Sequence, residues 1–132
     1  MKRGAVPVVA LAVLLLPGCD LTTGVGASCV GPQVTVTPTT VAAGDRVQVE
    51  GQWFFDDCYD SGQPGNPPAT QDVALRIVPS GSAARTFDLA TVDADENGEV
   101  HTAVTIPDDV PAGPARIESG VGRPADVVVT AP

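Results

Sequence analysis

The sequence predicts an all-β fold, a single sandwich of about seven strands spanning residues 33–132. From residue 33 onward, short runs of alternating apolar and polar residues are separated by clusters of Gly, Pro and Asp, the pattern of half-buried strands joined by turns. No stretch repeats its apolar residues with the 3.6-residue period of a helix. Seven short strands in about 100 residues are typical of two packed antiparallel sheets.

The expected strands follow one another in chain order as residues 33–38, 46–54, 72–79, 85–92, 99–107, 115–119 and 125–130. The alternation is clearest in residues 46–54, RVQVEGQWF, where Val47, Val49 and Trp53 share one face and the polar residues between them share the other. Continued to Phe55, the same alternation places Trp53 and Phe55 inward and Phe54 outward. One face of this strand is therefore expected to be buried and the other to be wet.

Residues 1–18 are expected to be a cleaved signal peptide. Lys2 and Arg3 form a positive start, residues 5–16 are an apolar run, and Pro17-Gly18-Cys19 is a small, turn-prone end. A transmembrane helix needs roughly 20 apolar residues to cross about 30 Å of hydrocarbon, and this run is shorter and is followed at once by Asp20. The segment therefore indicates export rather than a membrane span.

Leu16-Pro17-Gly18-Cys19 resembles the lipobox of bacterial lipoproteins, although Pro17 departs from the small residue usual at its position. The resemblance implies that a diacylglyceryl group is joined to the sulfur of Cys19 and that the chain is cut just before it. Two acyl chains suffice for stable anchoring. We therefore expect the mature protein on the extracytoplasmic face of the cell membrane, with membrane lipid as the partner of Cys19 and residues 19–32 as a short tether. A signal peptide that ends in cysteine by chance is the alternative.

The two remaining cysteines, Cys29 and Cys58, form an even pair in an exported chain, where oxidation is permitted. We expect a structural disulfide between them. Closing a loop of about 30 residues would contribute roughly 3.5 kcal/mol in the chain-entropy model. A metal pair and a redox pair are the alternatives, and a single histidine and the lack of a C-x-x-C motif disfavour both.

The charge of the chain disfavours nucleic acid as a partner. Without the predicted signal peptide, five Arg and no Lys stand against 16 acidic residues, a net charge of −11. Such a surface repels phosphate backbones. It also keeps a small domain soluble without any specific cationic ligand.

Two longer stretches resemble bacterial immunoglobulin-like domains. VTVTPTTVAAGDRVQVEGQWF is similar to their first hairpin, with a Val-x-Pro start, a Gly-Asp turn and a V-x-V-x-G strand. DADENGEVHTAVTIPDDVPAGPARIES is similar to their later part. The resemblance implies an immunoglobulin-like sandwich that serves as a spacer or binding module on the cell surface, although the Cys-Trp-Cys arrangement of antibody domains is absent. Such sandwiches host many functions.

The first candidate site is WFFDDCYDSGQPGNPPATQD, which begins with four of the five aromatic residues of the chain and continues as a Gly/Pro-rich loop. Loops on rigid sandwiches commonly carry binding functions, and aromatic residues are favoured at binding hot spots. The candidate binding residues are Phe54, Tyr59, Asp56, Asp57 and Asp60. The alternative is that the aromatic residues form the core beneath the loop, which we favour for Trp53.

The second candidate site is DADENGE, in which Asp93, Asp95 and Asn97 match the start of a D-x-D-x-N-G calcium loop. The twelfth position of that motif should be a bidentate Glu, and here it is Val104. An Asn-Gly hairpin turn explains the same residues without a metal. A calcium-binding structural or sensing lipoprotein is accordingly the alternative function.

No catalytic constellation is apparent. His101 is the only histidine and is expected to face outward, since Val100, Val104 and Ile106 face inward. No G-x-S-x-G elbow is present, and nothing singles out a glycosidase-type pair of carboxylates. We therefore expect a non-enzymatic protein without a cofactor that binds or supports a surface protein or cell-wall component. A small hydrolase is the least favoured possibility, and the oligomeric state is not indicated.

Overall fold

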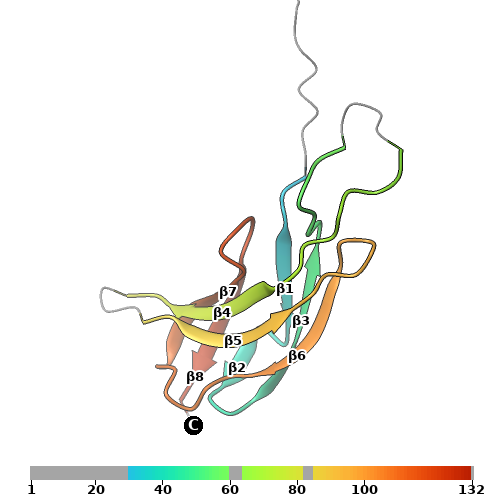
Figure 1. Cartoon of the computed structure of the whole chain (residues 1–132). Helices are drawn as coiled ribbons and strands as arrows, with labels where there is room; N and C mark the ends of the chain where they lie inside the picture. Colours follow the sequence, from blue (N-terminus) through green and yellow to red (C-terminus); the bar gives the residue numbers. More distant parts are fainter. Residues whose placement is uncertain (1–29, 60–63, 82–84, 132) are drawn as a thin grey trace, which may run out of the picture.

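A computed structural model of the chain describes residues 30–59, 64–81 and 85–131. These residues form eight strands and no helix (Figure 1). The strands are β1 (Gln33–Thr37), β2 (Thr40–Ala42), β3 (Arg46–Gln52), β4 (Val73–Pro79), β5 (Phe87–Val92), β6 (Val100–Thr105), β7 (Gly113–Glu118) and β8 (Ala125–Thr130). The prediction of an all-β sandwich is confirmed, with one strand more than expected.

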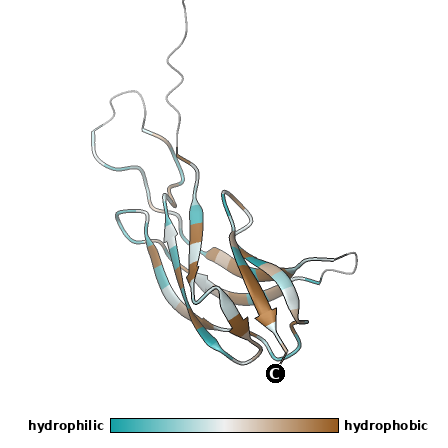
Figure 2. Cartoon of the chain, turned by 180° about the vertical axis from the view of Figure 1, so that it is seen from behind, coloured by the Kyte–Doolittle hydropathy of each residue, from teal (hydrophilic) through white to brown (hydrophobic). Residues whose placement is uncertain are grey.

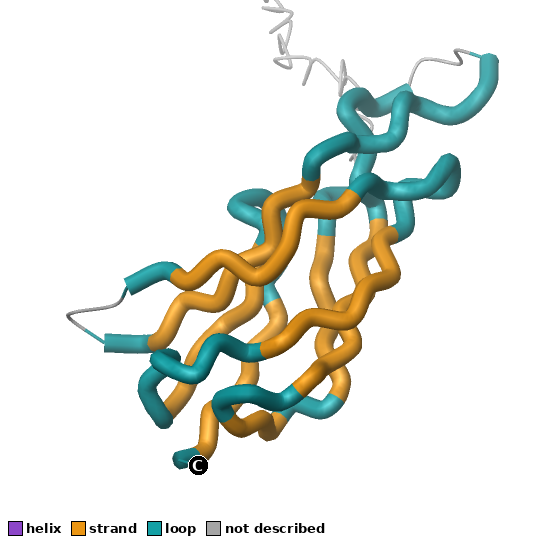
Figure 3. Tube along the Cα trace, turned by 60° about the horizontal axis from the view of Figure 1, so that its bottom comes forward, coloured by secondary structure: helices purple, strands orange, loops and turns teal. Residues whose placement is uncertain are grey.

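The strands form two sheets that pack face to face (Figures 1 and 3). One sheet has three strands in the order β1-β3-β6, and the other has five in the order β2-β8-β7-β4-β5. Neighbouring strands are antiparallel except β2 and β8, which pair in parallel. The chain crosses repeatedly between the two sheets, so each sheet combines segments that are distant in sequence.

The unexpected strand is β2, which lies between β1 and β3 in sequence and belongs to the other sheet. After Thr37, the last residue of β1, the chain leaves the three-stranded sheet and crosses to the five-stranded sheet. There Thr40 pairs with Val128 and Ala42 pairs with Thr130. The side chain of Val41, between them, is only 1% exposed. A strand of three residues is too short to show an alternating pattern, so the sequence alone did not predict it.

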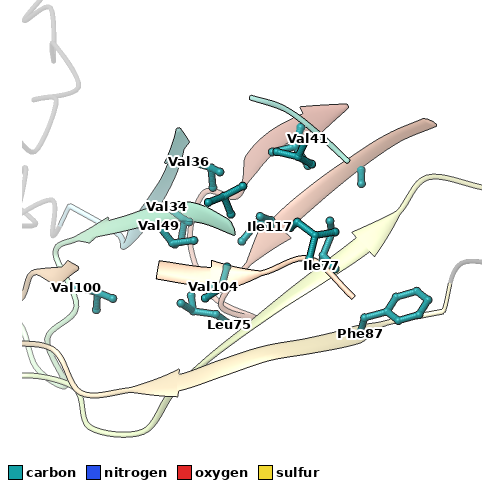
Figure 4. Packing of buried hydrophobic residues seen from close by; sticks show 14 of the residues in the cluster. Val34, Val36, Val41, Val49, Leu75, Ile77, Phe87, Val100, Val104 and Ile117 are labelled. Carbon is teal, nitrogen blue, oxygen red and sulfur yellow. The ribbon is translucent and has the colours of Figure 1, made fainter. Parts of the chain in front are cut away.

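The core lies between the sheets and consists mainly of aliphatic side chains, together with Phe54 and Phe87 (Figure 4). Alternation along β3 is complete, with every second residue buried, and Figure 2 shows the same alternation of hydrophobic and hydrophilic residues along the strands. None of the buried residues in the described part of the chain is polar or charged. The hydrophobic effect, at about 25 cal/mol per Å² of buried apolar surface, therefore drives the packing of the sheets.

The end of β3 differs from the prediction. The strand stops at Gln52 rather than at Phe54, because Trp53 adopts a left-handed backbone conformation with a φ of 66°. This turn reverses the expected alternation: Trp53 is 46% exposed, whereas Phe54 is 1% exposed and belongs to the core. The prediction that Phe54 faces outward and Trp53 inward was wrong.

The turn at residues 93–99 also differs from the prediction. It joins β5 to β6, which belong to different sheets, so it is a crossover between sheets rather than a β-hairpin. The carboxylate oxygen Oδ1 of Asp95 accepts hydrogen bonds from the backbone N–H groups of Asn97 and Glu99, each at 2.9 Å. Gly98 closes the turn with a φ of 70°, a conformation that glycine adopts without steric cost.

Candidate functional site

Backbone hydrogen bonds join the two ends of the loop that follows β3, and the joined segments form the base of the loop. The N–H of Thr70 donates to the carbonyl oxygen of Phe54, and the N–H of Asp56 donates to that of Pro68, both at 2.9 Å. Phe55 and Ala69 form an antiparallel bridge between these bonds. The base lies at the end of the sandwich where the described chain begins, opposite the C-terminus (Figure 1). These backbone bonds fix where residues 53–59 stand relative to the sheets.

Two glycines make room for the phenylalanine rings at this base. A Cβ atom on Gly51 would lie 2.5 Å from Cε2 of Phe54, and one on Gly98 would lie 2.6 Å from Cε2 of Phe55. The N–H of Phe54 also donates to the carbonyl oxygen of Gly98 at 2.9 Å. Phe54 is thereby packed into the core, and Phe55 lies over the turn between β5 and β6.

A pocket of about 530 Å³ opens beside this base. Its size is within the range of about 300–1,000 Å³ that is usual for small-ligand sites. One wall is the segment that leads into β1, and the other is the segment that follows β3. The lining residues are Val30, Gly31, Pro32, Trp53, Phe55, Asp56, Asp57, Cys58, Tyr59 and Pro67.

The structure brings three of the five predicted binding residues to this pocket. Tyr59, Asp56 and Asp57 line it, and both aspartates are exposed. Phe54 does not line it, since its ring is buried in the core. Asp60 lies outside the described residues.

The sequence interpretation missed Trp53 as a site residue. Its side chain lines the pocket and also borders a second depression of about 120 Å³ together with Gln52, Asn97 and Glu99. Alternation placed this indole in the core, and only the left-handed turn brings it to the surface. The contribution of residues 30–32 was missed as well, because no local pattern links this segment to the loop after β3.

The predicted lipidation and disulfide sites are described only in part. Cys58 lines the pocket and is a disulfide-bonded cysteine. Cys19 and Cys29 both lie outside the described residues. The lipid on Cys19 and the pairing of Cys29 with Cys58 therefore stay predictions.

Two of the three residues of the calcium motif, Asp93 and Asp95, accept hydrogen bonds from the backbone in this structure. Oδ1 of Asp93 accepts a hydrogen bond from the N–H of Asp72 at 2.9 Å, and Oδ1 of Asp95 accepts the two bonds of the turn described above. Asn97 is exposed beside them. Within residues 30–59, 64–81 and 85–131, no group of three or more His, Cys, Asp or Glu side chains is arranged to hold a metal ion.

His101 faces outward from β6, as expected. Its side chain is 61% exposed, and its Nε2 atom lies 3.4 Å from a carboxylate oxygen of Glu99. A pair this exposed contributes little to stability.

Comparisons with known proteins leave the family open. No family model matches the chain, and no curated protein matches it. One solved structure, the alkylpurine DNA glycosylase AlkC of Pseudomonas fluorescens bound to DNA containing an abasic-site analogue, is similar over 82% of this chain, with 18% sequence identity and a TM-score of 0.47. The chain covers 32% of that protein. Among the described residues, none forms a helix long and apolar enough to span a membrane.

Proposed function

We propose that this protein is a membrane-anchored surface lipoprotein whose β-sandwich is a non-enzymatic binding module for a protein or a cell-wall component. The observation that carries the proposal is the pocket between residues 30–32 and 53–59, with Trp53, Phe55 and Tyr59 in its walls. Aromatic side chains in a concave site provide large apolar contact area at a small cost in conformational entropy.

The exposure of Trp53 supports binding over a spacer role. An indole gains most when it is buried, yet this one is 46% exposed and is held in a left-handed conformation that costs an L-residue roughly 1–2 kcal/mol. The packing of Phe54 into the core offsets the cost of the backbone conformation, but the exposed part of the indole contributes nothing to folding and would be buried only by a partner that covers it.

The lipobox resemblance supports a position close to the membrane. Ten residues lie between Cys19 and Val30, so the eleven steps from one to the other span about 40 Å at most in a fully extended chain. Because Val30 lines the pocket, a lipid on Cys19 would keep the pocket within that distance of the bilayer. The partner would accordingly be a molecule that is accessible near the outer face of the membrane.

Fractionation of the native host tests the anchor. We expect the full chain in the membrane fraction and the Cys19→Ser variant in the soluble extracytoplasmic fraction. Equal distribution of the two proteins would contradict the anchor.

Binding is tested with the full-length protein in lipid vesicles, by co-sedimentation with isolated cell walls and by cross-linking to surface proteins on intact cells. We expect the Trp53→Ala/Tyr59→Ala variant to lose one of these interactions. The matched control is Val128→Ala, since Val128 is 48% exposed on β8 and does not line this pocket. Equal behaviour of both variants and the wild type would support a spacer instead.

A further inference from the structure

We propose that the pocket binds an organic cation, namely the lysine or arginine side chain of a basic segment in a partner protein. This inference rests on the proposed binding function and specifies the chemistry of its ligand. It follows from the aromatic walls of the pocket, the charges at its mouth, and the charge of the whole described surface.

The aromatic walls suit a cation. Trp53, Phe55 and Tyr59 all line the same space of about 530 Å³. The faces of aromatic rings carry negative charge density and attract ammonium and guanidinium groups within about 6 Å, most strongly at tryptophan. The apolar residues Val30, Pro32 and Pro67 beside them would pack against the methylene stem of a lysine or arginine.

The charged groups at the pocket are of one sign. Asp56 and Asp57 line it, and none of the lining residues in the described part of the chain is Lys or Arg. Oδ1 of Asp57 accepts a hydrogen bond from the N–H of Cys58 at 2.7 Å, a bond that orients this carboxylate at the pocket wall. In the described part of the chain, neither aspartate takes part in any of the four ion pairs. Among the residues that the structure describes, a cation would therefore find two carboxylates that are not paired with a basic side chain.

The basic residues of the described chain are engaged elsewhere or stand away from the pocket. Arg76 and Arg116 lie against Glu118, and Arg85 pairs with Asp109. Arg46 and Arg123 are not among the lining residues. Acidic residues outnumber basic residues over the whole chain. The long-range electrostatic field of the protein therefore attracts basic partners and repels acidic ones.

A neutral glycan fits this pocket less well. Neutral sugars present hydroxyl groups that both donate and accept hydrogen bonds, whereas the two exposed carboxylates here only accept them. Carboxylates accept hydrogen bonds from hydroxyl groups, yet their charge gains most from a ligand that is itself positive. The combination of three rings with two carboxylates therefore favours a cation.

Trp53 provides a direct reporter, since it is the only tryptophan in the chain. The detergent-extracted full-length protein is titrated with a short peptide of lysine and glycine, and the fluorescence of Trp53 is followed. The comparison ligand is the same peptide with every lysine Nε-acetylated, which removes the charge and preserves the length. We expect saturable binding of the first peptide and binding about tenfold weaker, or undetectable, for the second.

Paired variants locate the binding. We expect Asp56→Asn/Asp57→Asn to weaken binding about tenfold and Asp88→Asn/Asp126→Asn to leave it unchanged, because Asp88 and Asp126 are exposed on β5 and β8 and do not line the pocket. Both pairs remove two negative charges from the protein. By calorimetry, Trp53→Phe should retain binding better than Trp53→Ala, because the ring face is kept. Unchanged thermal unfolding of each variant shows that the fold is intact.

Several outcomes would overturn the inference. Equal weakening by the two Asp pairs would mean attraction to the overall charge and no specific pocket, and equal affinity for the acetylated peptide would mean that the charge is not recognised. If the wild type ignores basic peptides and binds cell-wall fragments through Trp53, the cationic ligand is wrong and the binding function stands. If it binds neither, the inference and the proposed function both fail.

Discussion

The ring of Phe54 occupies the space in which a side chain at position 51 would lie. A Cβ atom on Gly51 would approach Cε2 of Phe54 to 2.5 Å and Cβ of Val100 to 3.1 Å. Phe54 comes to this position because the backbone reverses at Trp53, so a glycine in β3, a left-handed tryptophan and a buried phenylalanine depend on one another. The same arrangement places Trp53 in the pocket wall.

The first prediction concerns Gly51. We expect Gly51→Ala to lower the free energy of unfolding by about 2 kcal/mol, because the added methyl overlaps the ring of Phe54, which is buried in the core. Urea unfolding of the full chain measures the change. Gly31→Ala is the control, since nothing lies within 4 Å of the added methyl, and it should change the value by less than about 0.5 kcal/mol. Similar effects of both substitutions would contradict the packing of Phe54 against Gly51.

The second prediction concerns the backbone at Trp53. Glycine adopts left-handed conformations without a Cβ penalty, so Trp53→Gly should be more stable than Trp53→Ala by about 1 kcal/mol. At the preceding position, Gln52 in β3, the order should reverse, because glycine weakens an ordinary strand position by roughly 0.5–1 kcal/mol relative to alanine. Chemical unfolding of the four variants gives both differences. Alanine as the more stable residue at both positions would show that Trp53 is not left-handed in solution.

The third prediction concerns Cys19, Cys29 and Cys58. The intact mass of protein extracted from its native membrane should match residues 19–132 plus lipid and should rise by two hydrogens on reduction. Removing the bridge should lower stability by about 3 kcal/mol, equally for Cys29→Ser and Cys58→Ser, because both open the same loop. A large effect of Cys58→Ser with none of Cys29→Ser would assign Cys58 a different partner.

The fourth prediction concerns calcium. Because Asp93 and Asp95 already accept backbone hydrogen bonds, we expect the same thermal unfolding midpoint in calcium and in a chelator. Asp95→Ala should cost about 1 kcal/mol in both solutions, since it removes two hydrogen bonds of the turn. A midpoint that rises only when calcium is added would instead support a metal at this turn.

The alternating segments were predicted well because burial on one face of a sheet imposes a period of two. Val47 and Val49 are buried in β3, and Val100, Val104 and Ile106 are buried in and just after β6, as the alternation indicated. The same reasoning failed at Trp53, because it assumes that the strand continues. Tryptophan gives no local signal of a left-handed conformation, which here follows from the packing of Phe54 into the core.

The sequence predicted only one of the two walls of the pocket, the segment that follows β3. The loop after β3 was singled out by its aromatic residues, and Tyr59, Asp56 and Asp57 do line the pocket. The opposite wall, residues 30–32, is separated from this loop by all of β1, β2 and β3. A contact of this kind depends on the tertiary fold, and a single sequence carries no periodicity that would reveal it.

The parallel pairing of β2 with β8 has a consequence for the order of folding. Thr40 in β2 pairs with Val128 in β8. β2 is synthesised early and β8 late, so β2 can form this pairing only after nearly all of the chain has been made. β1 and β3 can meet early, across a short connection, whereas the five-stranded sheet cannot be completed from its N-terminal edge inward. Native pairings across such long separations slow the folding of β-sandwiches to the range of milliseconds to seconds. The three-residue length of β2 limits how much unpaired strand edge is exposed while the chain waits for β8.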